Sequence, residues 1–244
     1  MRGLTAKEIL GLWEVGQQQM PAERALTLLS TFCPQTPRED LERLSIGRRD
    51  ALLLSFRELL FGSQFSGMTR CPHCRSTLEI GFSCADVRTT DAGEQAETLP
   101  VNIGEYSFKC RLPNSKDLLA VMDHRSIDSI SKALFERCVT EKRYRDAEVS
   151  FADLPEEVSE AVAAEIAKHD PQADIRFDLI CPDCSHQWEA IFDVVSFAWN
   201  ELCSWATRLI RQVHTLALAY GWRELDILSM NPLRRQIYLE MLGE

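Results

Sequence analysis

The sequence predicts an α+β fold that is mainly α, with helical segments at both ends of the chain and two short strand units between them. Three observations support this fold class. Apolar residues recur at helical spacing through the first 62 residues and again through the last third of the chain. Around residues 76–83 the pattern changes to the alternation of a strand. Two Cys-x-x-Cys motifs, "CPHC" and "CPDC", lie far apart, each followed by a strand pattern.

The N-terminal region, residues 1–68, is predicted to be helical. "TAKE", from Thr5 to Glu8, has the residue types of a capping box, and Pro21 suits the first position of a second helix. "TPRE", from Thr36 to Glu39, predicts another capping box at the start of a third helix. A fourth helix should cover "GRRDALLLSFRELLFG" and end near Gly62.

The middle of the chain combines strands and helices. "STLEIGFS" and "DIRFDLI" read as strands, while residues 85–97 are polar and are predicted to form a loop. A further strand is expected in "EYSFKCRL". Helices are expected in "SKDLLAVMD", "SIDSISKALFERCVTE" and "PEEVSEAVAAEIAKH". We therefore expect residues 85–172 to form a long α/β insertion.

The C-terminal region, residues 195–244, should be helical again. Six apolar positions step by three or four residues along one helix face: Leu202, Trp205, Leu209, Val213, Leu216 and Tyr220. Gly221 is a natural stop, and "WRELDILSM" and "NPLRRQIYLEML" predict two short helices after it. The apolar face is typical of core or partner contact, and nothing marks it as a cofactor pocket.

The two Cys-x-x-Cys motifs belong to a short internal repeat. "CPHCRSTLEIGF" aligns with "CPDCSHQWEAIF", so each copy is a Cys-Pro-x-Cys knuckle followed by a strand. Two knuckles can bring four thiolates to one zinc ion, which prefers a tetrahedral set of sulfur ligands. The sequence therefore predicts a split four-cysteine zinc ribbon, formed by residues 69–84 and 173–194. Its predicted ligands are Cys71, Cys74, Cys181 and Cys184.

Other interpretations of the motifs remain open. A redox-active pair would need a helix after its first Cys, whereas a strand pattern follows Cys74. Empty or degenerate knuckles are a further alternative, and His73 or His186 could supply a ligand instead of lying exposed. Four protein ligands leave no open position, so the zinc would have a structural role, fixing the insertion against the rest of the chain.

Composition and motifs narrow the function classes. The formal net charge of −10 argues against nucleic-acid binding. No apolar run predicts a membrane span, and the N-terminus lacks the apolar segment of a signal peptide, so we expect a cytoplasmic protein. Nine cysteines in such a compartment favour metal binding over disulfides. The sequence contains no HExxH, P-loop or GxSxG motif, so we do not expect an enzyme.

Several segments resemble the baseplate hub assembly family of T-even-type contractile phages, which also occurs in gene clusters of phage-like contractile injection systems. They are "PAERALTLL", "IGRRDALLLSFRELLFGSQFSGMTRCPHC", "CPDC" and "HTLALAYGWRELDILSMNPLRRQIYLEML". The resemblance implies an assembly factor or chaperone that binds baseplate hub or spike proteins. Such a protein would act in the bacterial cytoplasm or in association with the particle. The zinc knuckles are not universal in that family, so this function does not depend on them.

Four residues near the C-terminus are candidate partner contacts: Trp222, Arg234, Arg235 and Tyr238. Their types are enriched at binding hot spots, although Trp222 could equally cap the core below the helix end. The nearest rival function is a permanent structural subunit of the baseplate, which would need the same contact surfaces. A zinc-ribbon nucleic-acid module and a thiol oxidoreductase are the other rivals.

Overall fold

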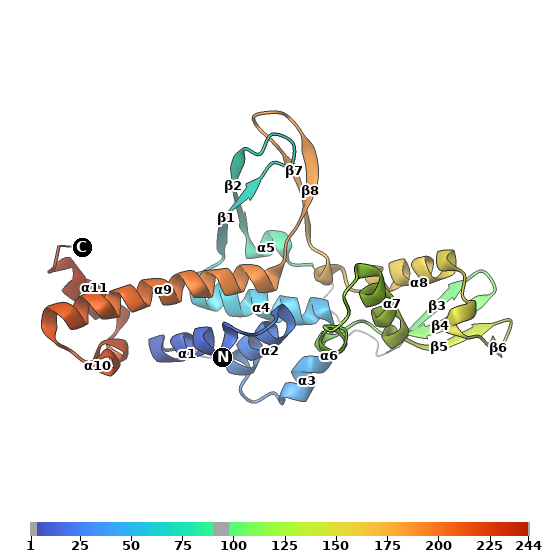
Figure 1. Cartoon of the computed structure of the whole chain (residues 1–244), viewed down its shortest axis with the longest axis horizontal. Helices are drawn as coiled ribbons and strands as arrows, with labels where there is room; N and C mark the ends of the chain where they lie inside the picture. The colour runs from blue at the N-terminus through green and yellow to red at the C-terminus, as the bar shows by residue number, and fades with distance from the viewer. Residues whose placement is uncertain (1–3, 90–97, 244) are drawn as a thin grey trace.

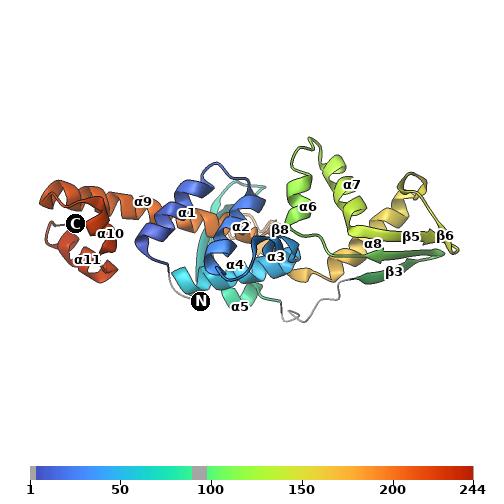
Figure 2. The ribbon, with the colours of Figure 1, turned by 90° about the horizontal axis from the view of Figure 1, so that it is seen from below.

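The computed structural model describes residues 4–89 and 98–243 and has the predicted mixed α+β architecture. A central helical body carries two β-hairpins that project from one side (Figure 1). The insertion lies at one end of the long axis, and the C-terminal helices lie at the other (Figure 2). Among the described residues, no helix is both long enough and apolar enough to cross a membrane.

The helical body buries the largest apolar core of the described chain. It consists of α1 (Ala6–Gly16), α2 (Pro21–Phe32), α3 (Arg38–Arg43), α4 (Ile46–Phe61) and the first part of α9 (Val194–Tyr220). The predicted capping box of α1 is present, with the Thr5 amide donating to the Glu8 carboxylate at 2.8 Å. Pro21 begins α2 and Gly62 ends α4 with a positive φ of 88°, both as predicted.

The start of α3 differs from the prediction. Pro37 takes the N-cap position, and no side chain caps the helix. Thr36 therefore lies one residue outside the position from which its hydroxyl could accept a hydrogen bond from the first turn. The predicted capping box at Thr36–Glu39 is wrong, because the proline itself sets the extended backbone that starts the helix.

The structure explains why glycine stands at position 47, at the beginning of α4. Its backbone amide donates to the Asp170 carboxylate at 2.9 Å, which ties α4 to the end of the insertion. A side chain at this position would place its Cβ 2.0 Å from an oxygen of Asp170. Only glycine leaves room for this contact between segments that are distant in sequence.

Each knuckle lies at the tip of a two-stranded antiparallel hairpin. The first hairpin pairs β1 (Gln64–Arg70) with β2 (Thr77–Ser83), and the second pairs β7 (Arg176–Ile180) with β8 (Gln187–Ile191). The first hairpin begins at Gln64, ahead of the boundary expected at residue 69. The burial of "QFSGMTR" alternates as in a strand, but Phe65 is the one large apolar residue at an inward position, and Met68 faces solvent, so the sequence lacks an apolar alternation.

The insertion has a core of its own. A four-stranded antiparallel sheet is ordered β3 (Leu99–Ile103), β4 (Tyr106–Cys110), β5 (Val139–Tyr144), β6 (Ala147–Glu148). The helices are α6 (Ser115–Ala120), α7 (Ile127–Cys138) and α8 (Glu156–Lys168), with 3-10 turns at Phe151–Asp153 and Pro171–Ala173. Apolar residues of the sheet and of α8 form a second buried cluster.

Two boundaries in this region differ from the prediction. The helix expected through residue 141 ends at Cys138, where β5 begins and pairs with β4. The loop expected over residues 85–97 begins instead with a short helix, α5 (Cys84–Val87). Residues 90–97 of that expected loop lie outside the described residues.

The C-terminal arm, residues 206–243, comprises the distal part of α9, α10 (Glu224–Ser229) and α11 (Pro232–Glu240). Gly221 ends α9 in the left-handed conformation, with a φ of 67°, as the sequence predicts, and the Asn231 side chain caps α11. Leu216, Ile227 and Leu239 form a small core within the arm. The arm therefore extends beyond the body and contains its own packing unit (Figure 1).

Candidate metal centre

The first knuckle is the turn of the first hairpin. The Cys71 amide donates to the Ser76 carbonyl at 3.0 Å, and the Arg75 amide donates to the Cys71 carbonyl at 2.9 Å. These two bonds fold the four residues of the motif into a tight loop. The loop requires a left-handed backbone at Arg75, with a φ of 63°.

The second knuckle repeats this geometry. The Cys181 amide donates to the His186 carbonyl at 2.9 Å, and the Ser185 amide donates to the Cys181 carbonyl at 2.8 Å. Ser185, the counterpart of Arg75, also has a left-handed backbone, at a φ of 57°. The repeat seen in the sequence is therefore a repeat of backbone structure, hydrogen bond for hydrogen bond.

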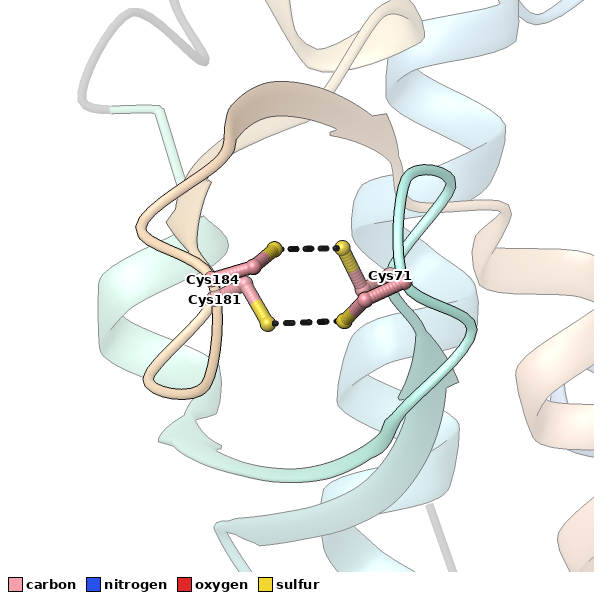
Figure 3. Close-up of side chains that lie close together, drawn as sticks. Cys71, Cys181 and Cys184 are labelled. Atoms are coloured by element: carbon pink, nitrogen blue, oxygen red, sulfur yellow. Dashed lines mark hydrogen bonds between the residues drawn. The ribbon is translucent and has the colours of Figure 1, made fainter.

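The two knuckles face each other and bring all four predicted ligands together (Figure 3). Cys71 Sγ lies 3.7 Å from Cys184 Sγ, and Cys74 Sγ lies 3.5 Å from Cys181 Sγ. All four sulfur atoms lie within 4.8 Å of one another. A tetrahedral ion with metal–sulfur bonds of about 2.3 Å has sulfur–sulfur edges of about 3.8 Å, whereas a disulfide needs about 2.05 Å. The cluster could therefore hold one metal ion.

Burial and electrostatics differ among the four thiols. Cys71 and Cys181 are buried, Cys184 is partly exposed and Cys74 is exposed. Hydrogen bonding with the side chain and backbone of Ser76 lowers the pKa of Cys74 to about 6. A hydrogen bond with the His186 backbone favours the Cys184 thiolate, but burial and the neighbouring sulfurs outweigh it and raise the pKa of Cys184 to about 12. Four thiolates this close together would repel one another, and a cation at their centre would remove that repulsion.

The two nearby histidines do not belong to the sulfur cluster. His73 and His186 stack on each other, with ring centroids 5.4 Å apart, and Trp188 continues the stack at 6.2 Å from His186. Among the described residues, the four cysteines are the single group of three or more potential ligands with metal-binding spacing. The ligand set is thus complete without an imidazole.

Aromatic rings hold the bases of the two hairpins together. Phe82 and Phe192, which occupy equivalent positions in the repeat, meet edge to face at 5.1 Å. Phe65 stacks on Phe82 at 4.7 Å, and Phe197 of α9 lies 5.0 Å from Phe65. The hairpins are therefore joined at their bases by apolar contact and at their tips by the four sulfurs.

Arg57 anchors this assembly to the helical body, and sequence reasoning missed it. Its side chain, 3% exposed, makes a bidentate ion pair with Glu201 of α9, with both bonds at 2.7 Å. It also donates to the carbonyls of Gly62 and Gln64, which lead into β1, and its guanidinium covers the Phe65 ring at 3.9 Å. The sequence did contain one indication of a buried arginine, because Arg57 interrupts the apolar run of α4.

The predicted partner contacts all lie on the C-terminal arm, away from the sulfur cluster. Trp222 is half-buried, stacks on Tyr220 at 4.5 Å and meets Tyr238 edge to face at 4.8 Å. Arg234 is exposed and lies over the Tyr238 ring at 5.6 Å. Arg235 is buried instead, donating to the Gln212 side chain at 3.2 Å and the Met230 carbonyl at 3.4 Å.

Exposed apolar side chains on the arm were also not singled out from the sequence. Leu218, Leu225, Leu233 and Met241 all point into solvent. Leu218 lies on α9, on the face opposite the buried stripe, whereas Leu225 lies on α10, Leu233 on α11 and Met241 directly after α11. None of the four belongs to the small core of the arm. For Leu218 the sequence carried a signal, namely an apolar residue on the helix face that the core does not use.

Comparison with known proteins places the chain among phage baseplate proteins. The family described as T4 bacteriophage base plate protein matches residues 2–199. This match covers the helical body, both hairpins and the insertion, and it ends inside α9, ahead of the C-terminal arm. No curated protein matches the chain. No solved structure matches it either.

Proposed function

The chain belongs to the T4 bacteriophage base plate protein family, and we propose that it is an assembly factor that binds a hub or spike subunit of a contractile baseplate through its C-terminal arm. The observation that supports this proposal is the exposed apolar surface of the arm. Leu218 is 80% exposed, Leu225 62%, Leu233 70% and Met241 69%. These side chains lie on successive helices of the arm, and exposed apolar surface of this kind is typical of a site that a partner covers.

The charge distribution agrees with this role for the arm. Residues 206–244 contain five Lys or Arg and four Asp or Glu, which is a net charge of +1. Residues 1–205 therefore carry a net charge of −11, against −10 for the whole chain. The arm presents its apolar residues without the excess negative charge of the body, so another protein can approach it at little electrostatic cost.

We further propose that the four-cysteine cluster holds a structural zinc ion. An all-sulfur set of four ligands suits zinc and leaves no position open for catalysis. The ion would join hairpins on opposite sides of the insertion, since Cys74 and Cys181 are separated by 107 positions. It would thereby fix the insertion relative to the body, while the arm remains free to contact the partner.

A permanent structural subunit of the baseplate is the second candidate, because the family description is simply that of a baseplate protein. The two roles differ in what remains in the finished particle. Mass spectrometry of purified mature particles separates them. Absence of the protein from particles that need its gene for assembly supports the assembly factor, whereas a fixed copy number supports the subunit.

The role of the arm is tested by Leu225→Lys/Leu233→Lys, which adds charge to two exposed positions without opening a core. We expect a normal melting temperature, loss of the hub or spike component in co-purification, and loss of particles. The matched control is Leu59→Lys, at an exposed apolar position on α4 of the body. Normal particle yield from the double variant would contradict the proposal.

A further inference from the structure

A basic pocket lies where the helical body meets the insertion. Its volume is about 550 Å³, and it is lined by the end of α3, the beginning of α4, the segment from β4 into α6, and α7. The Ile46 amide donates to the Pro113 carbonyl at 3.1 Å, and Ser45 forms an isolated β-bridge with Asn114. These contacts hold the two walls of the pocket at a fixed spacing.

The lining carries five cationic side chains and one carboxylate: Arg43, Arg48, Arg111, Lys116, Arg137 and Asp117. Asp117 is buried and accepts two hydrogen bonds from Arg111, at 2.5 and 2.7 Å, and one from Arg137, at 2.9 Å. A single carboxylate thus serves two arginines. The formal charge of the pocket is +4, within a chain whose net charge is −10.

The remaining three cations have little internal compensation. Arg43 has one carboxylate neighbour, Glu39, at 4.0 Å. Within residues 4–89 and 98–243, no ion pair joins Arg48 or Lys116 to an acidic group. Arg48 stands on the wall formed by the body and Lys116 on the wall formed by the insertion. Two exposed cations that face one pocket from opposite walls are positioned to bind an anionic ligand between them.

We propose that this pocket binds an acidic segment of another protein through the carboxylates of its Asp or Glu side chains. A peptide is favoured over a free phosphate because Arg48 and Lys116 stand on different walls, where separate carboxylates can reach each of them. The pocket is also lined by Leu44 and Leu112, which can contact the hydrocarbon part of a peptide. Separate carboxylates on an extended peptide can reach both walls.

This surface goes beyond the function proposed above. It uses neither the sulfur cluster nor the C-terminal arm, and it lies within the part of the chain that matches the baseplate family. A protein that binds one partner through an apolar arm and an acidic segment through this pocket could bring the two together. The charge of the pocket also makes its contact sensitive to salt, whereas contact through the arm should resist it.

The test uses the full-length protein and fluorescein-labelled hexaglutamate, with binding followed by fluorescence anisotropy. The variant is Arg48→Gln/Lys116→Gln, which removes two exposed charges and leaves the Asp117 ion pairs intact. We expect it to bind the peptide roughly tenfold more weakly than the wild type, because it loses two charge-assisted hydrogen bonds at a partly exposed site. Thermal melting should be unchanged.

The matched control is Lys7→Gln/Arg211→Gln, which removes the same net charge at exposed positions outside the pocket. It should retain wild-type affinity. Equal weakening by both double variants would overturn the proposal, since binding would then reflect overall charge. Equal binding of hexaglutamine, or no measurable binding of hexaglutamate, would also overturn it. Displacement of the peptide by pyrophosphate as readily as by unlabelled hexaglutamate would overturn the assignment to an acidic segment.

Discussion

Replacing Arg57 with methionine should destabilise the protein more than any exposed charge substitution would. The change keeps much of the aliphatic length that lies against Phe65 but removes every hydrogen bond of the guanidinium. Glu201, 25% exposed, loses both its 2.7 Å contacts and remains as an unpaired carboxylate. The carbonyls of Gly62 and Gln64 lose their donors at the point where α4 turns into β1.

The size of the effect follows from these contacts. Breaking a buried ion pair by removing one partner costs about 3–5 kcal/mol when the remaining charge is sealed from water. Glu201 is partly exposed, which lowers that cost. The carbonyls of Gly62 and Gln64, left without their donors, add to it. We therefore expect Arg57→Met to reduce the free energy of unfolding by about 3–4 kcal/mol. Arg57→Met/Glu201→Met should recover about 1–2 kcal/mol of this loss, because it removes the unpaired charge.

The measurement is urea unfolding at neutral pH with zinc in excess, followed by tryptophan fluorescence. The matched control is Arg88→Met, which breaks the ion pair between Arg88 and Glu58 at the protein surface. Arg88 is 34% exposed and Glu58 43%, so solvent screens the pair and the loss should be about 0–1 kcal/mol. If Arg57→Met is no more destabilising than Arg88→Met, the role of Arg57 as the anchor of the hairpins is refuted.

Three further predictions concern the metal centre, the insertion and the arm. Cys181→Ser should lower the zinc content below one ion per chain, while Cys203→Ser, outside the cluster, should leave it unchanged; full metal content in Cys181→Ser, measured by elemental analysis, would refute the four-sulfur site. Burial disfavours the Asp117 carboxylate, but hydrogen bonds and charge from Arg111 outweigh it and lower the pKa of Asp117, so its contribution to stability is present above pH 3.8 and is lost as the pH falls through its folded-state pKa. The stability deficit of Asp117→Asn should accordingly be largest near neutral pH and shrink in acid, and a deficit independent of pH would contradict this. Trp222→Ala should destabilise the arm by about 1–3 kcal/mol, less than a fully buried tryptophan would, and faster amide exchange in α11 but not in α4 would show it.

The parts of the fold that the sequence predicted correctly are those with local signals. Thr5, Pro21, Gly62 and Gly221 each mark a helix end by their own chemistry, and each is found at that end. The convergence of the four cysteines was also predictable, because the repeat implied two equal knuckles and a metal needs both. These inferences required no knowledge of how distant segments pack.

The features that were missed depend on distant partners. β5 reads "VTEKRY", whose charged residues continue a helical pattern, and only pairing with β4 across the insertion makes it a strand. The ion pair of Arg57 spans 144 positions, so the apolar run around Arg57 can indicate a buried arginine but not its partner Glu201. Arg235 was predicted to contact a partner, which needs an exposed side chain, but it is buried and donates to Gln212 on α9. Tertiary contact decided each of these three cases.

The division of the sulfur cluster between two distant knuckles has a consequence for biosynthesis. When Cys71 and Cys74 leave the ribosome, their partners have not yet been made, and the separation between Cys74 and Cys181 is 107 positions. At about 5–20 residues per second, the first pair waits roughly 5–20 seconds for the second. During that interval the two thiols are open to oxidation or to a stray metal ion. Loading of the proposed zinc ion therefore depends on reducing conditions until the second knuckle has emerged.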